Sequence, residues 1–406
     1  MTEQALETAA AHATQFLRGL ADRPVAARAG AEELRARLGG PLPEHPSDPA
    51  EVVAQLAKLA DDGLVATAGP RFFGFVVGGS LPAALAADWL AAAWDQNAGL
   101  FVLGPAAATV EDVAAGWLAE LLGLPPGVST GFVTGGLGAN FTGLAAARHH
   151  VLAQAGWDVE RDGLIGAPPV EVVVGAERHV TVDVALRYLG LGSGRLRVVP
   201  ADGQGRMDPA ALGGVLAGCD GPTIVCAQLG NVNSGACDPV GEICRLAHER
   251  MAWVHVDGAF GLWAAADPGR ASLVRGLGRA DSWATDGHKW LNVTYDCGIA
   301  FVRRPEDLRR TFAASAAYLP PSDVFEAMHH TPQSSQRARQ IEVWAVLRAL
   351  GREGVARLVS DDCDAAVTIA DRLRAGGFEV LNDVVLNQVL VRYADGPTTA
   401  RLMAAL

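Results

Sequence analysis

One lysine carries the most specific chemical signal in this 406-residue sequence. The chain has 33 lysines and arginines, but only Lys58 and Lys289 are lysines. A lysine amine can form a Schiff base with a carbonyl compound, whereas the guanidinium of arginine stays protonated and cannot. Lys58 lies in a helical pattern typical of a solvated face, while Lys289 follows an apolar, strand-like segment in the motif Asp-Gly-His-Lys-Trp. Lys289 is therefore the candidate nucleophilic amine.

Two further polar residues follow segments that have the pattern of strands. Asp257 ends the apolar run Trp-Val-His-Val-Asp, and His179 comes just after the run at residues 170–174. In a parallel sheet between helices, ligands bind beyond the carboxyl ends of the strands, so both residues are placed to reach a ligand. Taken singly, Asp257 would be an ordinary loop aspartate, and His179 would be a helix-capping or packing residue.

A glycine-rich turn precedes a predicted helix at residues 139–155. Its sequence, Thr-Gly-Gly-Leu-Gly-Ala-Asn at residues 134–140, places Gly135, Gly136 and Leu137 where unpaired backbone N–H groups could hold an anion. The turn contains neither a GK[ST] loop nor a GxGxxG fingerprint. Taken alone, it has the same pattern as an ordinary strand-to-helix turn.

Together, these features match the requirements of pyridoxal 5'-phosphate (PLP). This cofactor needs a lysine for its aldehyde, a carboxylate that holds its pyridine nitrogen protonated, and an anion site for its phosphate. A histidine could also stack on its ring. The combination, with each part at a strand end and in this chain order, is far more specific than any single part.

The sequence resembles the group II PLP-dependent amino-acid decarboxylases of fold type I, the family of the aromatic-amino-acid and glutamate decarboxylases. The resemblance covers residues 70–391, and its strongest motif is Ala-Asp-Ser-Trp-Ala-Thr-Asp-Gly-His-Lys-Trp-Leu at residues 280–291. It implies that Lys289 binds the cofactor, that Asp257 pairs with the pyridine nitrogen, and that His179 stacks on the ring. It also implies that a larger set of residues binds the cofactor: Gly135, Gly136, Leu137, Asn231, Ala259, Asp286 and His288.

The resemblance also implies substrate contacts, and one departure from the family pattern affects the phosphate site. The segment Pro-Arg-Phe-Phe-Gly-Phe at residues 70–75 resembles one that helps to line the substrate pocket. Leu137 stands where relatives usually have a phosphate-binding serine or threonine, so only its backbone N–H can serve. The candidate substrate contacts are apolar, which favours an aromatic or aliphatic amino acid: Phe75, Val76, Val77 and Gly78. The alternative is that Arg71 and residues of a partner subunit reverse this preference.

A polar loop at residues 320–336 is predicted to close over the cofactor. Many relatives place a catalytic tyrosine there, but residues 320–336 contain none. His329 and His330 are the residues of this loop that titrate near neutrality, so one of them is a candidate catalytic proton donor. The alternative is that both are solvent-exposed loop residues and that His179 or water supplies the proton.

Short apolar runs alternate with helical segments after about residue 130, which predicts an α/β fold with a mainly parallel sheet between helices. The resemblance makes this a fold-type-I architecture with a seven-stranded sheet. The predicted sheet strands are 170–174, 196–199, 223–228, 253–257, 282–285 and 298–302. Helices at 337–350 and 355–375, with strands at 378–381 and 388–393, are predicted to follow.

Three domains are expected. Residues 1–100 should form an N-terminal helical segment, residues 101–320 a large PLP-binding domain, and residues 321–406 a loop, a long helix and a small α+β domain. The small domain looks incomplete beside the family, which normally continues for some tens of residues. We therefore expect a chain that is naturally short or truncated.

Composition and charge exclude several classes of partner. The net charge of −12 and the isoelectric point of about 5.3 argue against nucleic acid and anionic membranes. No apolar run reaches the ~18 residues needed to span a bilayer, no spacing indicates a metal site, and the polar N-terminus is unlike a secretory signal. We therefore expect a cytoplasmic protein. Relatives clasp a partner with their N-terminal helices, so the resemblance implies a homodimer with an interfacial active site.

The predicted function is PLP-dependent decarboxylation of an L-amino acid to the corresponding amine and CO2, the reaction of a carboxy-lyase. Three alternatives are open. The chain could be an aldehyde synthase that couples decarboxylation to oxidative deamination, a carbon–carbon lyase of the same fold, or a non-catalytic homologue that binds PLP weakly or serves as an assembly partner. The sequence does not identify the amino acid.

Overall fold

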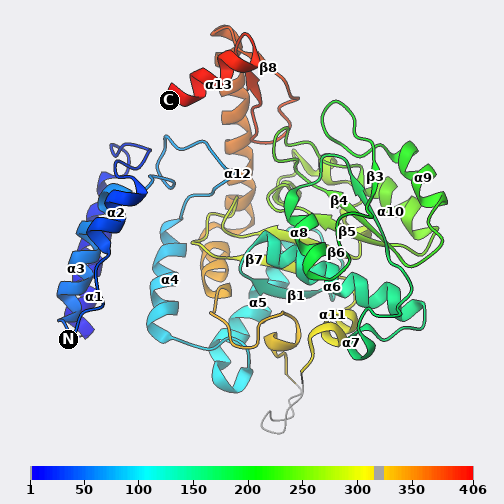
Figure 1. Cartoon of the computed structure of the whole chain (residues 1–406), viewed down its shortest axis with the longest axis horizontal. Helices are drawn as coiled ribbons and strands as arrows, with labels where there is room; N and C mark the ends of the chain where they lie inside the picture. The colour runs from blue at the N-terminus through cyan, green and yellow to red at the C-terminus, as the bar shows by residue number, and fades with distance from the viewer. Residues whose placement is uncertain (1, 315–323, 406) are drawn as a thin grey trace. The chain divides into compact units, whose positions relative to one another are not determined.

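The computed structural model describes residues 2–314 and 324–405, and the chain divides into two compact units, Met1–Gly79 and Ser80–Leu406. Each unit has its own packed elements, which are described separately below (Figure 1). The predicted division into three domains at residues 100 and 320 stays a prediction.

The first unit is built from three helices. Asp48 caps the third of them, because its side chain accepts hydrogen bonds from the N–H groups of Ala50 and Glu51. The other two helices pack against this one. The helices are α1 (Thr2–Gly19), α2 (Ala31–Leu38) and α3 (Pro49–Ala60), followed by the short 3-10 helix η1 (Asp61–Gly63).

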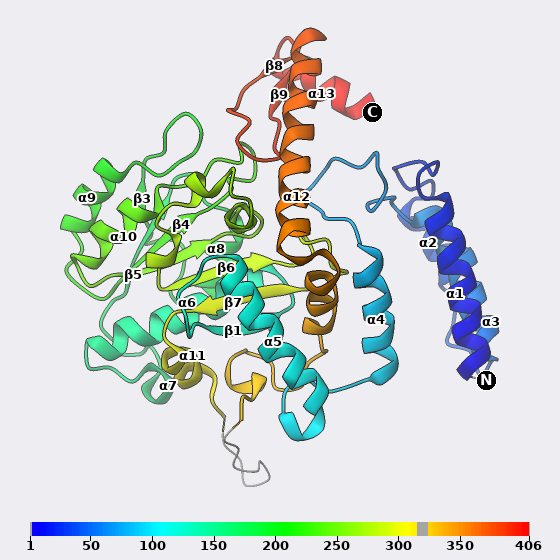
Figure 2. The ribbon, with the colours of Figure 1, turned by 180° about the vertical axis from the view of Figure 1, so that it is seen from behind.

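Three long helices of the second unit pack together, with α4 and α5 both against α12 (Figure 2). They are α4 (Pro82–Trp94), α5 (Pro105–Leu121) and α12 (Gln340–Ala375). α12 leaves helical geometry at Gly351, where φ is 60° and ψ is −178°, so it is kinked between the two helices that the sequence predicts. No helix in the described part of the chain is long and apolar enough to cross a membrane.

A seven-stranded sheet forms the centre of the second unit, in the order β1-β7-β6-β5-β4-β2-β3. Every strand runs parallel to the others except β7, which is antiparallel to both of its neighbours. The prediction of a mainly parallel seven-stranded sheet between helices is confirmed. The strands are β1 (Ser129–Val133), β2 (Glu171–Gly175), β3 (Arg197–Val199), β4 (Thr223–Gln228), β5 (Trp253–Asp257), β6 (Ser282–Asp286) and β7 (Gly298–Val302).

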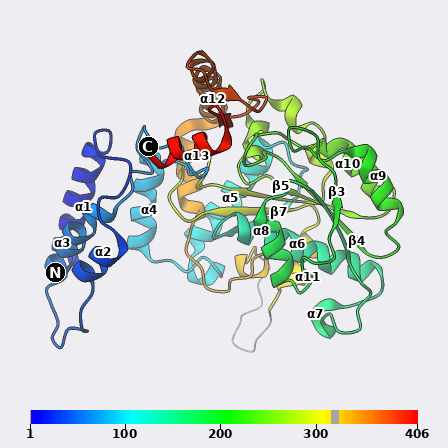
Figure 3. The ribbon, with the colours of Figure 1, turned by 45° about the horizontal axis from the view of Figure 1, so that its top comes forward.

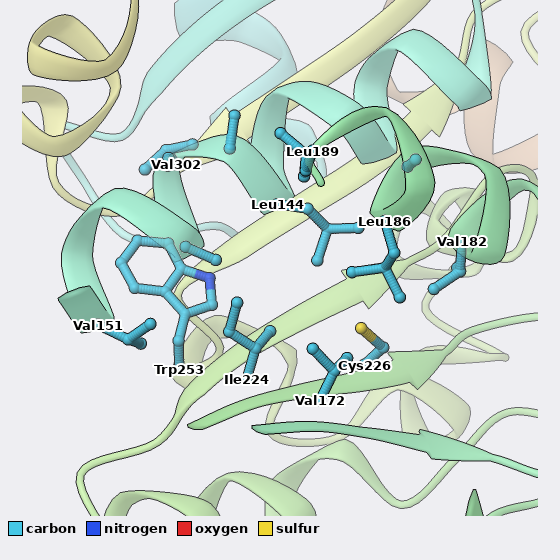
Figure 4. Close-up of a cluster of buried hydrophobic side chains, with 14 of the residues drawn as sticks. Leu144, Val151, Val172, Val182, Leu186, Leu189, Ile224, Cys226, Trp253 and Val302 are labelled. Atoms are coloured by element: carbon cyan, nitrogen blue, oxygen red, sulfur yellow. The ribbon is translucent and has the colours of Figure 1, made fainter. Parts of the chain in front are cut away.

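One face of the sheet is covered by α6 (Gly136–Gln154), α8 (Val180–Tyr188) and α11 (Pro305–Phe312). Leu144 and Leu186 from these helices meet Ile224 and Trp253 from the strands in a buried apolar cluster (Figure 4). Outside that cluster, α9 (Pro209–Ala217) packs against β3, and α10 (Val240–His248) packs against β4 and β5 (Figure 3). The short helix α7 (Val159–Asp162) contacts α6.

The C-terminal elements are smaller than predicted. The strands β8 (Glu379–Val380) and β9 (Val391–Arg392) form an antiparallel pair that is followed by α13 (Gly396–Ala405). A two-stranded ribbon is marginal by itself, and here Asn382 supplements it. The Asn382 amide donates to the carbonyl oxygens of Gln388 and Ser234, and its oxygen accepts from the N–H of Leu390. Short 3-10 helices complete the unit: η2 (Phe101–Leu103), η3 (Gly261–Ala266), η4 (Ala271–Val274), η5 (Leu277–Arg279) and η6 (Ala327–His329).

Helix α5 carries a buried carboxyl group, Glu111, that has no hydrogen-bond partner. The residue is 1% exposed, and neither side-chain oxygen is paired within the structure. Burial raises the pKa of Glu111 from its ordinary 4.5 to about 8. The folded chain therefore binds a proton here that the unfolded chain releases above about pH 4.5, so this group lowers stability as the pH rises toward 8.

We expect Glu111→Gln to flatten that pH dependence, because the amide cannot ionise. At pH 9 the variant should be more stable than the parent by several kcal/mol, because each unit of the pKa rise from 4.5 to about 8 corresponds to roughly 1.4 kcal/mol, while at pH 5 the two should differ little. Urea unfolding at pH 5, 7 and 9 measures this. Glu120→Gln is the control, since that exposed residue of α5 pairs with Arg352 at the surface. Equal stability of Glu111→Gln and parent at pH 9 would contradict the prediction.

Candidate active site

The carboxyl edge of the sheet gathers the residues that the sequence analysis singles out. Asp257 is the last residue of β5, and its register neighbours are Gln228 in β4 and Ala284 in β6, so these strands end side by side. Lys289 lies just after β6, and His179 lies just after β2. The glycine-rich turn follows β1 at the same edge, because β1 runs parallel to β6 on the far side of β7.

Asp257, Lys289 and His179 are close enough to act on one another electrostatically. The Asp257 carboxyl group is 3% exposed, and one oxygen accepts a hydrogen bond from the N–H of Ala259 at 3.2 Å. Burial raises the pKa of Asp257, and interactions with Lys289 and His179 oppose that rise. A cation placed against this carboxylate would stabilise its charged form.

His179 caps the start of α8. Its Nδ1 accepts the backbone N–H of Thr181 at 3.3 Å and lies 2.8 Å from the Thr181 hydroxyl. The hydroxyl in turn accepts from the side-chain amide of Asn140 at 3.2 Å. Since Nδ1 is an acceptor, the neutral imidazole carries its proton on Nε2. The helix-capping role that the sequence allows for His179 is therefore observed, and it leaves the rest of the ring available to a ligand.

A buried hydrogen-bond chain continues behind Asn140. The ring of His255 is fully buried, which lowers its pKa to about 3, so it is neutral. Its Nε2 donates to the Asn140 oxygen at 2.9 Å, and its Nδ1 accepts from the Ser282 hydroxyl at 2.8 Å. Ser282 accepts from the indole N–H of Trp253 at 2.9 Å. The Asn140 amide also hydrogen-bonds the Asp257 side chain. The chain therefore fixes the orientation of Asn140 and, through Thr181, of His179.

Gly143 allows α6 to approach this chain. A Cβ atom at that position would lie 2.7 Å from Cε1 of His255 and 3.3 Å from the Ser282 hydroxyl oxygen. Any larger residue would displace the imidazole and break its two hydrogen bonds. The close approach of α6 to β5 therefore depends on the absence of a side chain at Gly143.

Helix α6 begins without a side-chain cap. Its N-cap residue is Gly135, whose lack of a side chain leaves the first backbone N–H groups, those of Gly136 and Leu137, free for an anion. The side chain of Leu137 packs against the buried apolar cluster. Leu137 can therefore contact an anion through its backbone N–H and not through its side chain. A Cβ atom on Gly136 would lie 2.7 Å from Oδ2 of Asp286, which shows how closely β6 approaches this turn.

Asp286 and His288 lie between the turn and Lys289. The Lys289 Nζ is 3.0 Å from Oδ2 of Asp286. The ring of His288 packs against that of Tyr295 in a tilted arrangement, with centroids 4.4 Å apart, and its Nδ1 accepts a hydrogen bond from the N–H of Cys297 at 3.0 Å. Burial lowers the pKa of His288, so the ring is neutral with its proton on Nε2. That donor is 3.7 Å from Oδ1 of Asp286.

Two other predicted cofactor contacts have structural partners. The Asn231 side-chain amide donates to the Glu177 carbonyl and the Gln228 side chain, and its oxygen accepts from the N–H groups of Asn233 and Ser234. Asn231 therefore ties the loop after β4 to the loop that carries His179. Ala259 accepts the N–H of Asp286 at 2.9 Å and so ties the end of β6 to the turn after β5. Their contacts with a cofactor stay predictions.

The candidate substrate contacts lie in the first unit. Phe75 and Val76 have positive φ angles of 60° and 51°, an unusual conformation for bulky residues, and the Phe75 side chain is 93% exposed. Val77 and Gly78 follow them. Because these residues belong to Met1–Gly79 and Lys289 belongs to the other unit, their role in substrate binding stays a prediction.

The structure does not bring His330 to Lys289 within the chain. Its Nδ1 is 2.8 Å from the hydroxyl of Ser129, the first residue of β1. That position is at the amino edge of the sheet, about 13 Å along β1 from the glycine-rich turn at the carboxyl edge. Burial lowers the pKa of His330 to about 4, so it is neutral at pH 7 and is not a solvated loop residue.

His329 ends η6, directly before His330, and its Nδ1 is buried without a hydrogen-bond partner. The proton-donor role predicted for one of these histidines therefore stays a prediction, and a donor in the same chain would have to move from this position. Residues 320–323 of the predicted loop lie outside the described residues.

The residues present fit PLP. They offer an amine at Lys289, a buried carboxylate at Asp257 and an uncapped helix start at Gly136, all at one sheet edge. Across residues 2–314 and 324–405, no group of three or more histidine, cysteine, aspartate or glutamate side chains could hold a metal ion. The sequence analysis missed the supporting roles of Asn140, Thr181, His255 and Ser282, although these residues lie in or beside the motifs that it identified.

The sequence matches one known family over most of its length. Residues 32–394 match the pyridoxal-dependent decarboxylase conserved domain. The chain belongs to this decarboxylase family. This match confirms the predicted family and the predicted PLP cofactor. It also confirms the predicted enzyme class, a PLP-dependent amino-acid decarboxylase.

Similar proteins include enzymes for several amino acids. The aromatic-L-amino-acid decarboxylase of Bacillus atrophaeus is 27% identical over 388 residues, which are 92% of this chain and 78% of that protein. Tryptophan decarboxylase 1 of Oryza sativa subsp. japonica is 31% identical over 79% of this chain and 66% of its own length. The L-2,4-diaminobutyrate decarboxylase of Rhizobium meliloti is 28% identical over 89% of this chain. This chain thus spans 78%, 66% and 72% of the lengths of these three relatives.

Solved structures confirm the fold-type-I architecture. The Oryza sativa TDC with PLP and tryptamine superposes with a TM-score of 0.92 at 25% identity, over 100% of this chain and 88% of that one. Mouse CSAD has a TM-score of 0.87 at 25% identity, over 99% of this chain and 85% of that one. The Rhodiola rosea 4-hydroxyphenylacetaldehyde synthase shares the fold alone, with a TM-score of 0.88 at 22% identity.

The hydrogen-bond chain leads to a prediction for Thr181→Val, which removes the hydroxyl between Asn140 and His179 but keeps the branched shape. We expect the free energy of unfolding to fall by about 1 kcal/mol, the contribution of one hydrogen bond. The rate of amine formation should fall roughly tenfold, because His179 loses a contact that orients it. Urea unfolding and product assays measure the two effects.

Thr311→Val is the matched control, since that hydroxyl donates to the Asp307 carbonyl within α11. It should lose similar stability and keep the parent rate. If Thr181→Val also kept the parent rate, the chain of hydrogen bonds would have no part in orienting His179.

Proposed function

We propose that the chain uses PLP to decarboxylate an L-amino acid with an apolar side chain, releasing the amine and CO2. The observation that carries the proposal is the meeting of Lys289, Asp257 and His179 at the sheet edge, beside the free N–H groups of α6. When bound, PLP supplies an electron sink for the bond that breaks at Cα. The apolar segment at residues 75–78 and the exposed aromatic ring of Tyr295 beside His288 support an apolar substrate.

Each residue has a distinct proposed task. Lys289 supplies the amine that bonds the cofactor aldehyde and yields its place to the substrate amine. Asp257 holds a proton on the pyridine nitrogen, because its buried carboxylate is stabilised by the cation that results. His179, oriented by Thr181 and Asn140, packs on the ring face. The N–H groups of Gly136 and Leu137, with Nε2 of His288, hold the phosphate.

Reductive trapping tests the central assignment. Borohydride treatment of the PLP-loaded protein should place a pyridoxyl group on Lys289 in peptide mapping, and Lys289→Ala should remove it. Lys58→Ala is the matched control, because it removes the other lysine of the chain and should leave the label in place. Label on Lys58, or no label in the parent, would overturn the assignment.

Product analysis with a panel of L-amino acids tests the reaction. We expect CO2 and amine in equal amounts from an aromatic or aliphatic substrate, and loss of turnover in Asp257→Ala even where the cofactor still binds. Aldehyde, ammonia and oxygen consumption would instead indicate the aldehyde-synthase alternative. Near-normal turnover in Asp257→Ala would refute the role of that carboxylate. Preference for an acidic or basic amino acid would refute the apolar substrate class.

We propose further that the protein is a cytoplasmic homodimer whose active sites lie at the subunit interface. Two neighbouring segments of the second unit support a subunit contact, because α4 and η2 expose large apolar side chains. Helix α4 has one charged side chain along its length, Asp88. The exposed residues are Trp89, Leu90, Trp94, Phe101, Val102 and Leu103.

Sedimentation at micromolar concentration should give the mass of a dimer. The double change Leu90→Glu with Trp94→Glu should shift the protein to monomers and reduce activity, since charges replace apolar side chains in the contact. Ile165→Glu is the control, because Ile165 is also highly exposed but lies far along the chain from these segments. A fully active monomeric parent would rule the dimer out.

A further inference from the structure

The anion cradle at the start of α6 contains a negative charge of its own. Asp286 ends β6 at this point, and the structure places its carboxyl group against the glycine turn. A Cβ atom on Gly136 would lie 2.7 Å from Oδ2, and one on Gly135 would lie 3.7 Å from Oδ1. Both carboxyl oxygens therefore lie beside the backbone that offers the free N–H groups.

This carboxyl group is deeply buried and poorly satisfied. Asp286 is 1% exposed, and Oδ1 has no hydrogen-bond partner. The nearest donor on that side, Nε2 of His288, is 3.7 Å away, beyond hydrogen-bonding distance. A buried carboxylate normally accepts several hydrogen bonds. Oδ1 of Asp286 accepts none, so no hydrogen bond offsets the negative charge on this side of the carboxyl group.

Lys289 is the cation that balances Asp286. Its Nζ lies 3.0 Å from Oδ2, and in the described part of the chain no other cationic side chain forms an ion pair with Asp286 at so short a distance. The proposed function assigns the same amine to the cofactor aldehyde. The bound state would therefore bring a phosphate dianion beside Asp286 and also compete for the cation that neutralises it.

We propose that Asp286 weakens the binding of the cofactor's phosphate, so that this decarboxylase holds PLP reversibly and discriminates poorly against its dephosphorylated form, pyridoxal. The inference rests on the proposed function, since it assumes that the phosphate lies at the start of α6. A phosphate dianion held by those N–H groups would lie beside this buried carboxylate, and two negative charges close together in a site shielded from water repel each other strongly. An asparagine in this position would keep the shape of the side chain, remove the repulsion and offer the phosphate an N–H donor.

The decisive experiment compares PLP with pyridoxal, which has the same ring and aldehyde but no phosphate. Binding to apoprotein is followed by tryptophan fluorescence and by absorbance of the bound chromophore. Asp286→Asn should bind PLP about tenfold or more tightly than the parent, while its affinity for pyridoxal should change less than twofold. The dissociation constant of inorganic phosphate, measured directly by calorimetry on the apoprotein, should be about tenfold lower in the variant than in the parent.

The matched control is Asp296→Asn. Asp296 lies on the same connection after β6 and pairs with Arg339, so the control makes the same change in net charge without touching the cradle. It should alter PLP affinity less than twofold. Asp286→Ser, a second variant that removes the charge with a smaller side chain, should also tighten PLP binding, and circular dichroism checks that each variant is folded.

Three outcomes would overturn the inference. PLP binding that is unchanged or weaker in both Asp286 variants would show that the carboxylate does not oppose the phosphate. An equal gain for PLP and pyridoxal would show that Asp286 acts through Lys289 alone. A parent that binds no PLP would refute the proposed function instead. Calorimetry with inorganic phosphate would then still test the charge of Asp286, and equal phosphate affinity in parent and Asp286→Asn would overturn the inference.

Discussion

The orientation of the site depends on a buried imidazole that stays neutral. His255 lies inside the layer between β5 and α6, where it donates to Asn140 and accepts from Ser282. A protonated ring could not accept from Ser282, so burial and hydrogen bonding require the same charge state. That requirement reaches from Trp253 in the sheet to His179 at the start of α8 through groups that are each satisfied. The polar groups of the site are thus held by the core that supports them.

Much of this fold is predictable from sequence because its strands are apolar and regular. The boundaries of β4, β5 and β7 coincide with the predicted ones, and those of β2, β3 and β6 differ by one residue at one or both ends. β9 is shorter than the predicted strand by three residues at its start. β1 is not predicted, because its five residues, Ser-Thr-Gly-Phe-Val, are short of the β-branched apolar run that marks the other strands. Its identity as a strand comes from pairing with β7, a contact between distant parts of the chain.

The site also contains residues that the sequence identifies and residues that it does not. Lys289, Asp257 and His179 could be found from sequence, because each chemical type follows a strand and the motifs are specific. The roles of Asn140, Thr181 and Ser282 could not, since they depend on which side chains meet across α6, α8 and the sheet. The position of His330 is also a tertiary effect. Its bond to Ser129 places it at the edge opposite Lys289, which no local pattern near residue 330 indicates.

The reversed direction of β7 has a consequence for how the site can vary. A parallel crossover would carry the chain after β6 to the opposite edge of the sheet, but the antiparallel return keeps the whole connection between Asp286 and Gly298 at the edge where ligands bind. Lys289 follows the end of β6 closely, so a residue gained or lost between Asp286 and Lys289 would shift its amine relative to the sheet edge. Substitutions and length changes nearer to Gly298 can alter the chemistry of this edge while the spacing between β6 and the amine stays the same.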